Sequence, residues 1–320
     1  DRASIQRRID DLLDWLTQLG EVRMTLLEDD RRFDFAVLEY AIRAELLDLE
    51  EIRPWANDPR HYVGLIADGL ATVAGRPYAP VGERIPALVS RMREAVPLLA
   101  AARANLRTPP RLWTELAIAD TRGLVSWLRD DLPAALAAQG AAPDAVTGAA
   151  EALAGALEAY AAWLSDELLP RSNGDFRLGQ YLFQRKLLYE EHVNLGAQRL
   201  DQINEQKIAE YTARVTEAAA RIDPSRSPRE IMDSLTRVHP APGDLLPTAR
   251  DMMMRARDWV LESGVVAVPT AELPQVVETP PYARGGFAAM DAPGPVVDPG
   301  LAAFFYMTNV DPTGTAVQQA

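Results

Sequence analysis

Apolar residues recur every three or four positions along most of this chain, which is the spacing that lines one face of an α-helix. Ile5, Leu12 and Leu16 open the pattern, and Ile42 and Leu49 continue it. Prolines and glycines separate the successive stripes, as expected where helices end. The pattern predicts a mainly α fold, a multi-helix and bundle-like body with helices over about 2–20, 32–53, 60–75, 82–105, 111–138, 143–168, 176–190, 194–222, 227–237 and 244–263.

The character of the sequence changes near Val265. Residues 265–320 carry eight prolines and two short runs of β-forming residues, Val265–Val268 and Phe304–Met307. So short a segment without disulfides or metal rarely folds alone. We therefore predict a helical domain over 1–264 and a proline-rich, partly β segment over 265–320 with two or three short strands. This segment is expected to pack on the helical domain or to pair with strands that come from elsewhere.

Charge and cysteine content exclude several classes of function. The formal net charge is −13, whereas nucleic-acid binding needs clustered Lys and Arg, so no nucleic-acid partner is expected. The chain has no Cys, which removes disulfides and thiolate metal ligands. No apolar run is long enough to span a membrane. A cytoplasmic location is therefore expected, with export left open because the sequence begins at Asp1 rather than at Met.

No local motif for catalysis or metal binding is present. The three histidines, His61, His192 and His239, have no histidine partner three or four residues away, as a helical zinc site requires. Phosphate-binding glycine loops and the serine-hydrolase elbow are also missing. Adjacent acids such as Glu190 and Glu191 point to different faces of a helix and are typical of a solvated surface. We assign no catalytic residue and no metal ligand to this chain.

Several local structures follow from residue chemistry. Asp58 before Pro59 and Ser227 before Pro228 predict helix starts, since each supplies a capping oxygen ahead of a proline at the first helical position. Between two helices, Asn173-Gly174 predicts a turn with positive φ, and Asp175 is expected to cap the following helix. The segment from Glu278 to Arg284 is interpreted as an ordered loop or as part of a binding site.

Four phrases of the sequence together resemble one known family. They are LLPRSNGDFRLG at 168–179, HPAPGDLL at 239–246, ETPPYARGGF at 278–287, and APGPV at 292–296 followed by FFY at 304–306. Their order and spacing resemble the bacterial family named domain of unknown function 885, over nearly the whole chain. Members of that family look like zinc-dependent, mostly helical peptidases related to the gluzincins.

This resemblance implies a peptidase function and places zinc binding and substrate binding in different parts of the protein. In the family, the His-Glu-x-x-His helix and a downstream glutamate ligand follow the part that this chain resembles. The resemblance therefore implies a substrate-cleft-forming portion of a zinc-dependent metallopeptidase, inactive alone. Zinc is expected in a missing C-terminal catalytic portion, from the same gene or a second polypeptide, which would be its partner. Tyr282, Arg284, Tyr306 and Asn309 are the predicted contacts to the peptide substrate.

Two other interpretations stay open. The first is a non-catalytic helical scaffold that binds a protein or peptide partner. The second is an enzyme, a lyase or a hydrolase, that uses scattered carboxylates. A His-Glu-x-x-His motif encoded soon after Ala320 would favour the peptidase, whereas stoichiometric zinc on the isolated chain would indicate a site that the sequence motifs do not reveal.

Overall fold

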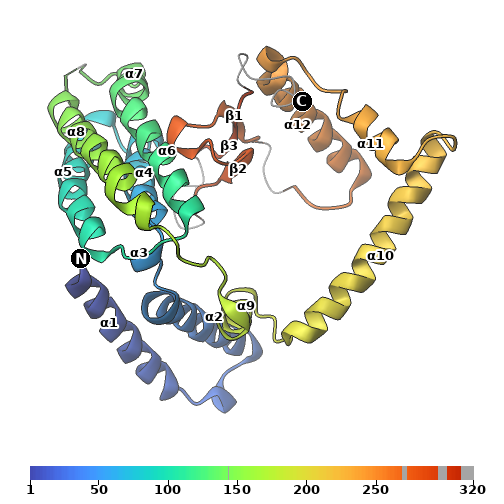
Figure 1. Cartoon of the computed structure of the whole chain (residues 1–320), viewed down its shortest axis with the longest axis horizontal. Helices are drawn as coiled ribbons and strands as arrows, with labels where there is room; N and C mark the ends of the chain where they lie inside the picture. Colours follow the sequence, from blue (N-terminus) through green and yellow to red (C-terminus); the bar gives the residue numbers. More distant parts are fainter. Residues whose placement is uncertain (143, 269–271, 295–300, 311–320) are drawn as a thin grey trace. The chain divides into compact units, whose positions relative to one another are not determined.

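The computed structural model describes residues 1–142, 144–268, 272–294 and 301–310 of the 320-residue chain (Figure 1). Its contacts divide the chain into two units. Unit 1 comprises Asp1–Gly75 and Pro80–Ile203, and unit 2 comprises Arg76–Ala79 and Asn204–Ala320. The predicted boundary between 264 and 265 falls inside unit 2, where the helices end and the strand-containing segment begins.

Unit 1 is built from helices around a core of leucine and alanine. Its central helices are α4 (Arg60–Gly75), α5 (Val81–Asn105), α6 (Arg111–Ser126) and α8 (Thr147–Trp163). Their apolar stripes face one another, so that Leu124, Leu153 and Leu157 are fully buried. Beside them, α1 (Arg2–Gly20) and α2 (Asp29–Leu46) form a hairpin with its own small core around Leu12 and Leu46. The remaining elements of unit 1 are η1 (Met24–Leu26), α3 (Pro54–Asn57), α7 (Leu132–Ala138), η5 (Leu169–Arg171) and α9 (Gly179–Glu191).

Three helices of unit 1 end in π-helical turns, namely η2 (Leu47–Ile52), η3 (Trp127–Asp131) and η4 (Leu164–Leu168). The first is closed by Arg53, which takes the left-handed conformation ahead of Pro54. π-Turns of this kind are uncommon and often lie at functional sites. They are also places where a helix stays continuous although the sequence pattern shifts, as in the predicted helix over 111–138.

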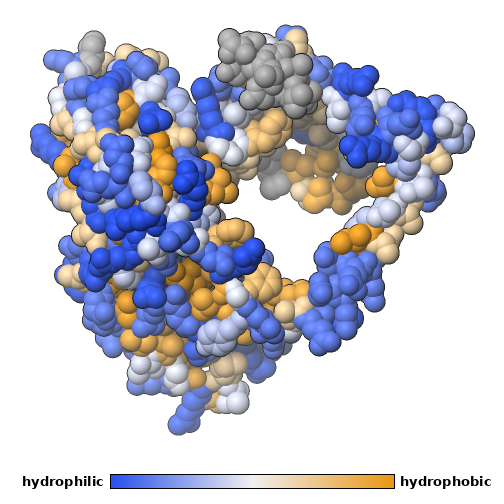
Figure 2. Space-filling model, viewed as in Figure 1, coloured by the Kyte–Doolittle hydropathy of each residue, from blue (hydrophilic) through white to orange (hydrophobic). Residues whose placement is uncertain are grey.

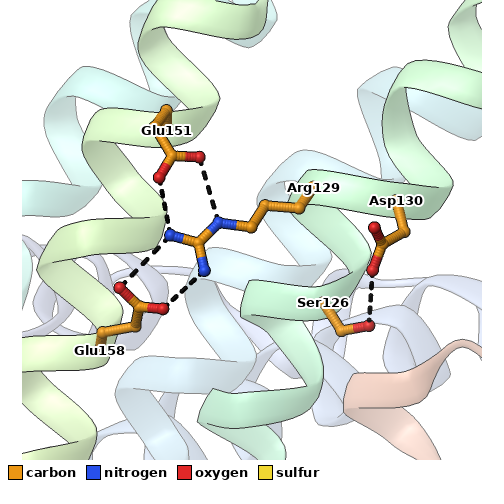
Figure 3. Close-up of polar contacts among 5 residues, drawn as sticks. All are labelled: Ser126, Arg129, Asp130, Glu151 and Glu158. Atoms are coloured by element: carbon orange, nitrogen blue, oxygen red, sulfur yellow. Dashed lines mark hydrogen bonds and ion pairs between the residues drawn. The ribbon is translucent and has the colours of Figure 1, made fainter.

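Two arginines fasten helices of unit 1 together. Arg84 is buried and donates hydrogen bonds to the carbonyls of Val73 and Ala74 at the end of α4, at 2.6 and 3.1 Å. Arg129, in η3, reaches α8 and binds Glu151 and Glu158, with closest distances of 2.7 and 2.6 Å (Figure 3). Arg84 thus binds helix-end carbonyls that lack intrahelical partners. Arg129 forms an exposed network of bidentate ion pairs.

Unit 2 contains α10 (Ala197–Ile222, from Asn204 on), α11 (Pro228–Leu235), η6 (Pro242–Asp244), α12 (Leu245–Ser263) and a three-stranded sheet. Ser227 and Glu230 form a capping box at the start of α11, as the Ser-Pro pair predicts. The strands are β1 (Gln275–Glu278), β2 (Ala288–Asp291) and β3 (Phe304–Met307), in the order β1-β3-β2. The 3-10 turn η7 (Pro281–Ala283) lies between β1 and β2.

The structure confirms the mainly α prediction, and most predicted helices agree with it to within a few residues. None of the described helices is both long enough and apolar enough to cross a bilayer. The predicted β run Phe304–Met307 is confirmed as β3, whereas Val265–Val268 forms no strand. Strand formation depends on pairing, which β3 finds with two neighbours and Val265–Val268 does not.

Two local predictions around residue 174 are wrong. Neither Asn173 nor Gly174 has a positive φ. A Cβ at Gly174 would instead lie 2.1 Å from the carbonyl oxygen of Thr108, so glycine is required there by close backbone approach. Asp175 accepts a hydrogen bond from the backbone N–H of Arg177 at 3.0 Å and does not cap α9, which begins only at Gly179.

Candidate functional site

The three strands of unit 2 bring distant parts of the sequence to one end of the sheet. β1 runs parallel to β3, and β2 runs antiparallel to β3, so the ends of β1 and β3 meet the start of β2. Backbone hydrogen bonds extend the pairing there, from Thr279 N–H to Met307 O at 2.9 Å and from Thr308 N–H to Phe287 O at 2.8 Å. The connections 279–287 and 308–310, which carry three of the predicted substrate-binding residues, therefore start from the same end of the sheet.

Arg284 lies at this end of the sheet with its guanidinium half-exposed. Its Nη2 donates to Glu278 Oε1 at 2.9 Å, and its Nε donates to the carbonyl of Thr279 at 3.3 Å. Both side chains of the ion pair keep nearly half of their surface accessible, at 49% and 48%. The predicted carboxylate-binding arginine thus holds a carboxylate of its own chain, in a geometry that leaves the group open to solvent.

Tyr306 lies in the middle of the central strand, half-buried. The register places it beside Val277 of β1 and Ala289 of β2, in one row across the sheet. Burial raises the pKa of its phenol, and the nearby carboxylate of Asp291 raises it further, while the cation of Arg76 opposes both. Tyr306 is therefore a neutral hydrogen-bonding group at physiological pH.

The other two predicted residues lie on the connections. Tyr282 is part of η7 and is partly buried. The side-chain oxygen of Asn309 accepts a hydrogen bond from the backbone N–H of Val310 at 3.0 Å, so the contact that it makes is local. Substrate contact by these four residues stays a prediction.

Sequence reasoning missed Thr279, Arg76 and Asp291. Thr279 is only 5% exposed, and its hydroxyl oxygen has no hydrogen-bond partner among the described residues. An unsatisfied buried polar group carries a cost of about 1–3 kcal/mol, and this one lies at the same end of the sheet as Arg284. The Arg76–Asp291 pair joins residues far apart in the sequence, and no local pattern could indicate it.

A groove of about 610 Å³ runs along β1 in the same unit. Its walls are α12, through Arg250 and Met254, and the residues of β1 with the preceding Leu273 and Pro274. Arg250 Nη2 donates to the carbonyl of Val276 at 3.0 Å. The methionine run at 252–254 is the one sequence signal for this groove, because flexible Met side chains suit adaptable binding surfaces.

A smaller pocket of about 340 Å³, with apolar and charged lining residues, lies in unit 1 around residues 174–178. Its three carboxylates are each paired with an arginine of the same unit. The pairs are Asp58–Arg60, Asp175–Arg177 and Glu51–Arg185. Because its charges balance internally, this pocket does not favour a charged ligand, and the phrase LLPRSNGDFRLG has a structural role here.

His61 follows this polar network on α4. Burial lowers the pKa of His61, and the carboxylates of Asp58 and Asp48 oppose that change. Burial also raises the pKa of Asp48, against the effect of Lys186. The histidine is thus held mainly neutral by its surroundings, with its ring against that of Tyr62 at 5.2 Å.

The histidines do not form a zinc site. His192 packs against the ring of Tyr40 at 4.9 Å, and Nδ1 of His239 lies 2.9 Å from the carbonyl oxygen of Pro240. Over residues 1–142, 144–268, 272–294 and 301–310, no group of three or more His, Asp or Glu side chains is arranged to hold a metal ion. These residues do not fit the zinc that the resemblance implies, and no catalytic step is assigned to them.

Comparison with known proteins finds a matching family model and a solved structure with a similar fold. The family model for a bacterial protein of unknown function (DUF885) matches residues 1–319. A solved structure described as a "putative lipoprotein of unknown function" from Shewanella oneidensis is 20% identical, with a TM-score of 0.61. The match covers 100% of this chain, which spans 60% of the length of that chain. At this identity the likeness shows the fold alone. No curated protein matches.

Proposed function

The chain belongs to DUF885, a family of bacterial proteins of unknown function, and from that premise we propose that it forms the peptide-binding wall of a zinc-dependent peptidase. The metal ligands would lie outside these 320 residues. The observation that carries the proposal is the groove beside β1, because it combines an apolar wall with a strand edge. Such an edge is a common means of binding an extended peptide.

The edge of β1 presents backbone groups in the right pattern. Gln275 and Thr279 direct their N–H groups toward β3, to Ala303 O and Met307 O at 2.8 and 2.9 Å. Since successive residues of a strand alternate in direction, Val276 and Glu278 direct theirs away from β3. Their backbone groups face the edge on which a peptide would add as a further strand.

The side chains around that edge suit a peptide with apolar residues. Met254 and Leu273 supply apolar contact, and Arg250 already binds the edge carbonyl of Val276. Two turns further along the same face of α12, Arg257 has a buried Nε without a hydrogen-bond partner among the described residues. Because this nitrogen has almost no accessible surface, a peptide carbonyl would reach it only after the side chain turns outward.

At the end of the sheet, the predicted residues would hold the peptide in place. Arg284 and Tyr306, with Tyr282 and Asn309, are proposed to contact a peptide carboxylate or backbone, next to the unpartnered hydroxyl of Thr279. Zinc, when bound by the catalytic portion, would supply water activation and carbonyl polarisation. This chain would contribute orientation of the peptide and exclusion of water.

Peptide binding to the purified chain tests the proposal. We would measure fluorescence anisotropy of a labelled, valine- and threonine-rich peptide of about ten residues. Glu278→Pro removes the outward N–H without disturbing the pairing to β3, and we expect about tenfold weaker binding. Glu278→Gln loses the same charge and the same ion pair with Arg284 but keeps the N–H, so it is the reference against which Glu278→Pro is compared. Equal binding by both variants would exclude the strand edge as the site.

The non-catalytic scaffold is the alternative, and the same assay distinguishes it when combined with a longer chain. Both functions predict that the 320-residue chain binds peptide and leaves it uncut. Only the peptidase predicts chelator-sensitive cleavage once the DUF885 protein includes a His-Glu-x-x-His portion. In that enzyme, Arg284→Ala and Tyr306→Phe should raise KM more than they lower kcat if these residues bind the peptide.

A further inference from the structure

The long helix α10 exposes an apolar stripe, which is interrupted near the buried Ala219. Ile208, Tyr211, Val215 and Ile222 recur at intervals of three, four and seven residues, which places them on one face. Their exposed fractions are 58%, 53%, 47% and 62%. Within unit 2, only the last turns of α10 bury a residue, Ala219, and Figure 2 shows apolar residues at the surface along the helix.

One border of this stripe is basic. Lys207, Arg214 and Arg221 follow one another at intervals of seven residues, so they line the same side of the stripe. The cations of Lys207 and Arg214 lie over the ring of Tyr211, at 5.8 and 5.5 Å from its centre. These contacts hold two of the charges against the apolar stripe.

The basic border also has carboxylate neighbours on its far side. Lys207 and Arg214 both approach Glu210, at 2.7 and 3.6 Å, and Arg221 approaches Glu217 at 3.3 Å. All of these side chains are largely exposed, and exposed pairs of this kind contribute little to stability. The cations can therefore turn to a second carboxylate at little cost.

We propose that α10 is a docking surface for an amphipathic helix of a partner protein, with an apolar stripe bordered by Asp or Glu. The apolar residues of the partner would cover Ile208, Val215 and Ile222. Its carboxylates would face Lys207, Arg214 and Arg221, as at the borders of a coiled coil. This inference is independent of the peptide groove, which is formed by other elements.

A second copy of α10 does not meet this requirement. In an antiparallel pair, the basic border would face another basic border. In a parallel pair, Lys207 and Arg214 would face Thr212 and Ala219, which offer no charge. A helix of different sequence, with carboxylates along one border, is therefore the partner that complements the basic border.

A lipid surface does not complement the basic border of α10 either. Interfacial helices bind anionic membranes through an excess of Lys and Arg. α10 carries equal numbers of both signs, with Glu210 and Glu217 beside the basic border. Its charged residues are Arg199, Lys207, Arg214 and Arg221 against Asp201, Glu205, Glu210 and Glu217.

Two designed helical peptides test the proposal on the full chain. Both carry the same leucine and isoleucine stripe, bordered by Glu in one and by Lys in the other. We expect the Glu-bordered peptide to bind at least tenfold more tightly, by anisotropy at low salt. Arg214→Glu with Arg221→Glu should reverse that preference. Arg31→Glu with Arg32→Glu, on exposed positions of α2, makes the same charge change elsewhere and should leave it unaltered.

Other results would overturn the proposal. These are equal binding of both peptides, a preference that survives charge reversal on α10, or a Val215→Glu variant that still binds. Sedimentation of the chain as a dimer that Val215→Glu dissociates would assign the stripe to self-association. Binding to vesicles containing phosphatidylglycerol, lost in the same variant, would assign it to membranes. Circular dichroism of each variant checks that α10 remains helical.

Discussion

The helices at the centre of unit 1 and those of unit 2 are both amphipathic, but they differ in what covers their apolar faces. Leu153 and Leu157 of α8 are fully buried, whereas Ile208 of α10 and Trp259 of α12 are 58% and 60% exposed. Burial of a leucine or isoleucine side chain contributes about 1.5–3 kcal/mol. The central helices of unit 1 therefore cover one another, whereas these positions on α10 and α12 keep apolar surface exposed.

The comparison shows what an amphipathic pattern means. Periodicity indicates that a helix has an apolar face, but not whether that face is covered by the same chain. In unit 1 the covering elements are successive helices. In unit 2 the exposed Met254 lines the groove beside β1, and Ile208 lies along a basic border on α10, which are properties of interaction surfaces.

Truncation of one side chain in each unit tests this contrast, and it has the largest expected effect. Leu157→Ala leaves a cavity in the core of unit 1 and should lower the free energy of unfolding by about 3 kcal/mol. Ile208→Ala on α10 should change it by less than about 0.5 kcal/mol, because the side chain is largely hydrated already. Urea unfolding followed by circular dichroism measures both. Similar losses in the two variants would show that α10 is packed in solution.

Much of the helical body could be predicted because its signals are local. Caps such as Ser227 with Glu230 and the three-to-four spacing of apolar residues fix where helices begin and which face is apolar. The sheet was harder to predict from the sequence. Phe304–Met307 and Val265–Val268 are both runs of β-forming residues, yet only the first finds two partners in register.

The candidate site was predictable in part, for the same reason. Arg284 stands in a recognisable phrase, so its place could be anticipated. Thr279 shares the phrase, but its buried and unpartnered hydroxyl follows from pairing with β3. The contact of Arg250 with Val276 spans two elements, and no spacing within either of them indicates it.

Gly174 gives a second test, of intermediate size, of how tightly unit 1 is packed. Because its Cβ position is 2.1 Å from the carbonyl oxygen of Thr108, Gly174→Ala must displace backbone. We expect a loss of about 1–3 kcal/mol in the free energy of unfolding. Gly155→Ala is the matched control, since no atom lies within 4 Å of its Cβ position on α8. That variant should be stabilised by about 0.5–1 kcal/mol.

In urea unfolding, the two glycine variants should move the midpoint in opposite directions. A neutral Gly174→Ala would mean that the approach of residues 108 and 174 is looser than the hydrogen bond from Gly174 N–H to Pro109 O, at 3.1 Å, indicates. The conformation at Gly174 would then impose no steric requirement, since its φ is not positive.

The smallest effect is expected at the surface of unit 1, where Arg129 holds Glu151 (Figure 3). The hydrogen bonds from Arg129 keep the pKa of Glu151 below its ordinary value, and its positive charge acts in the same direction. A folded-state pKa below the unfolded one stabilises the protein above the unfolded pKa of about 4.3. That contribution is lost as the pH falls through the folded pKa.

Arg129→Gln should therefore raise the pKa of Glu151 toward its ordinary value, as followed by carbon NMR of the carboxyl group. The pH at which the variant loses stability on acidification should move upward. The change should be small, because the pair is exposed to solvent. Arg122→Gln removes an exposed charge on α6, about two turns before Arg129, and should leave the pKa of Glu151 unchanged. If both variants shift Glu151 equally, general charge acts on it rather than the bidentate contact. The contact between η3 and α8 would then not be one of the interactions that hold the helices of unit 1 together.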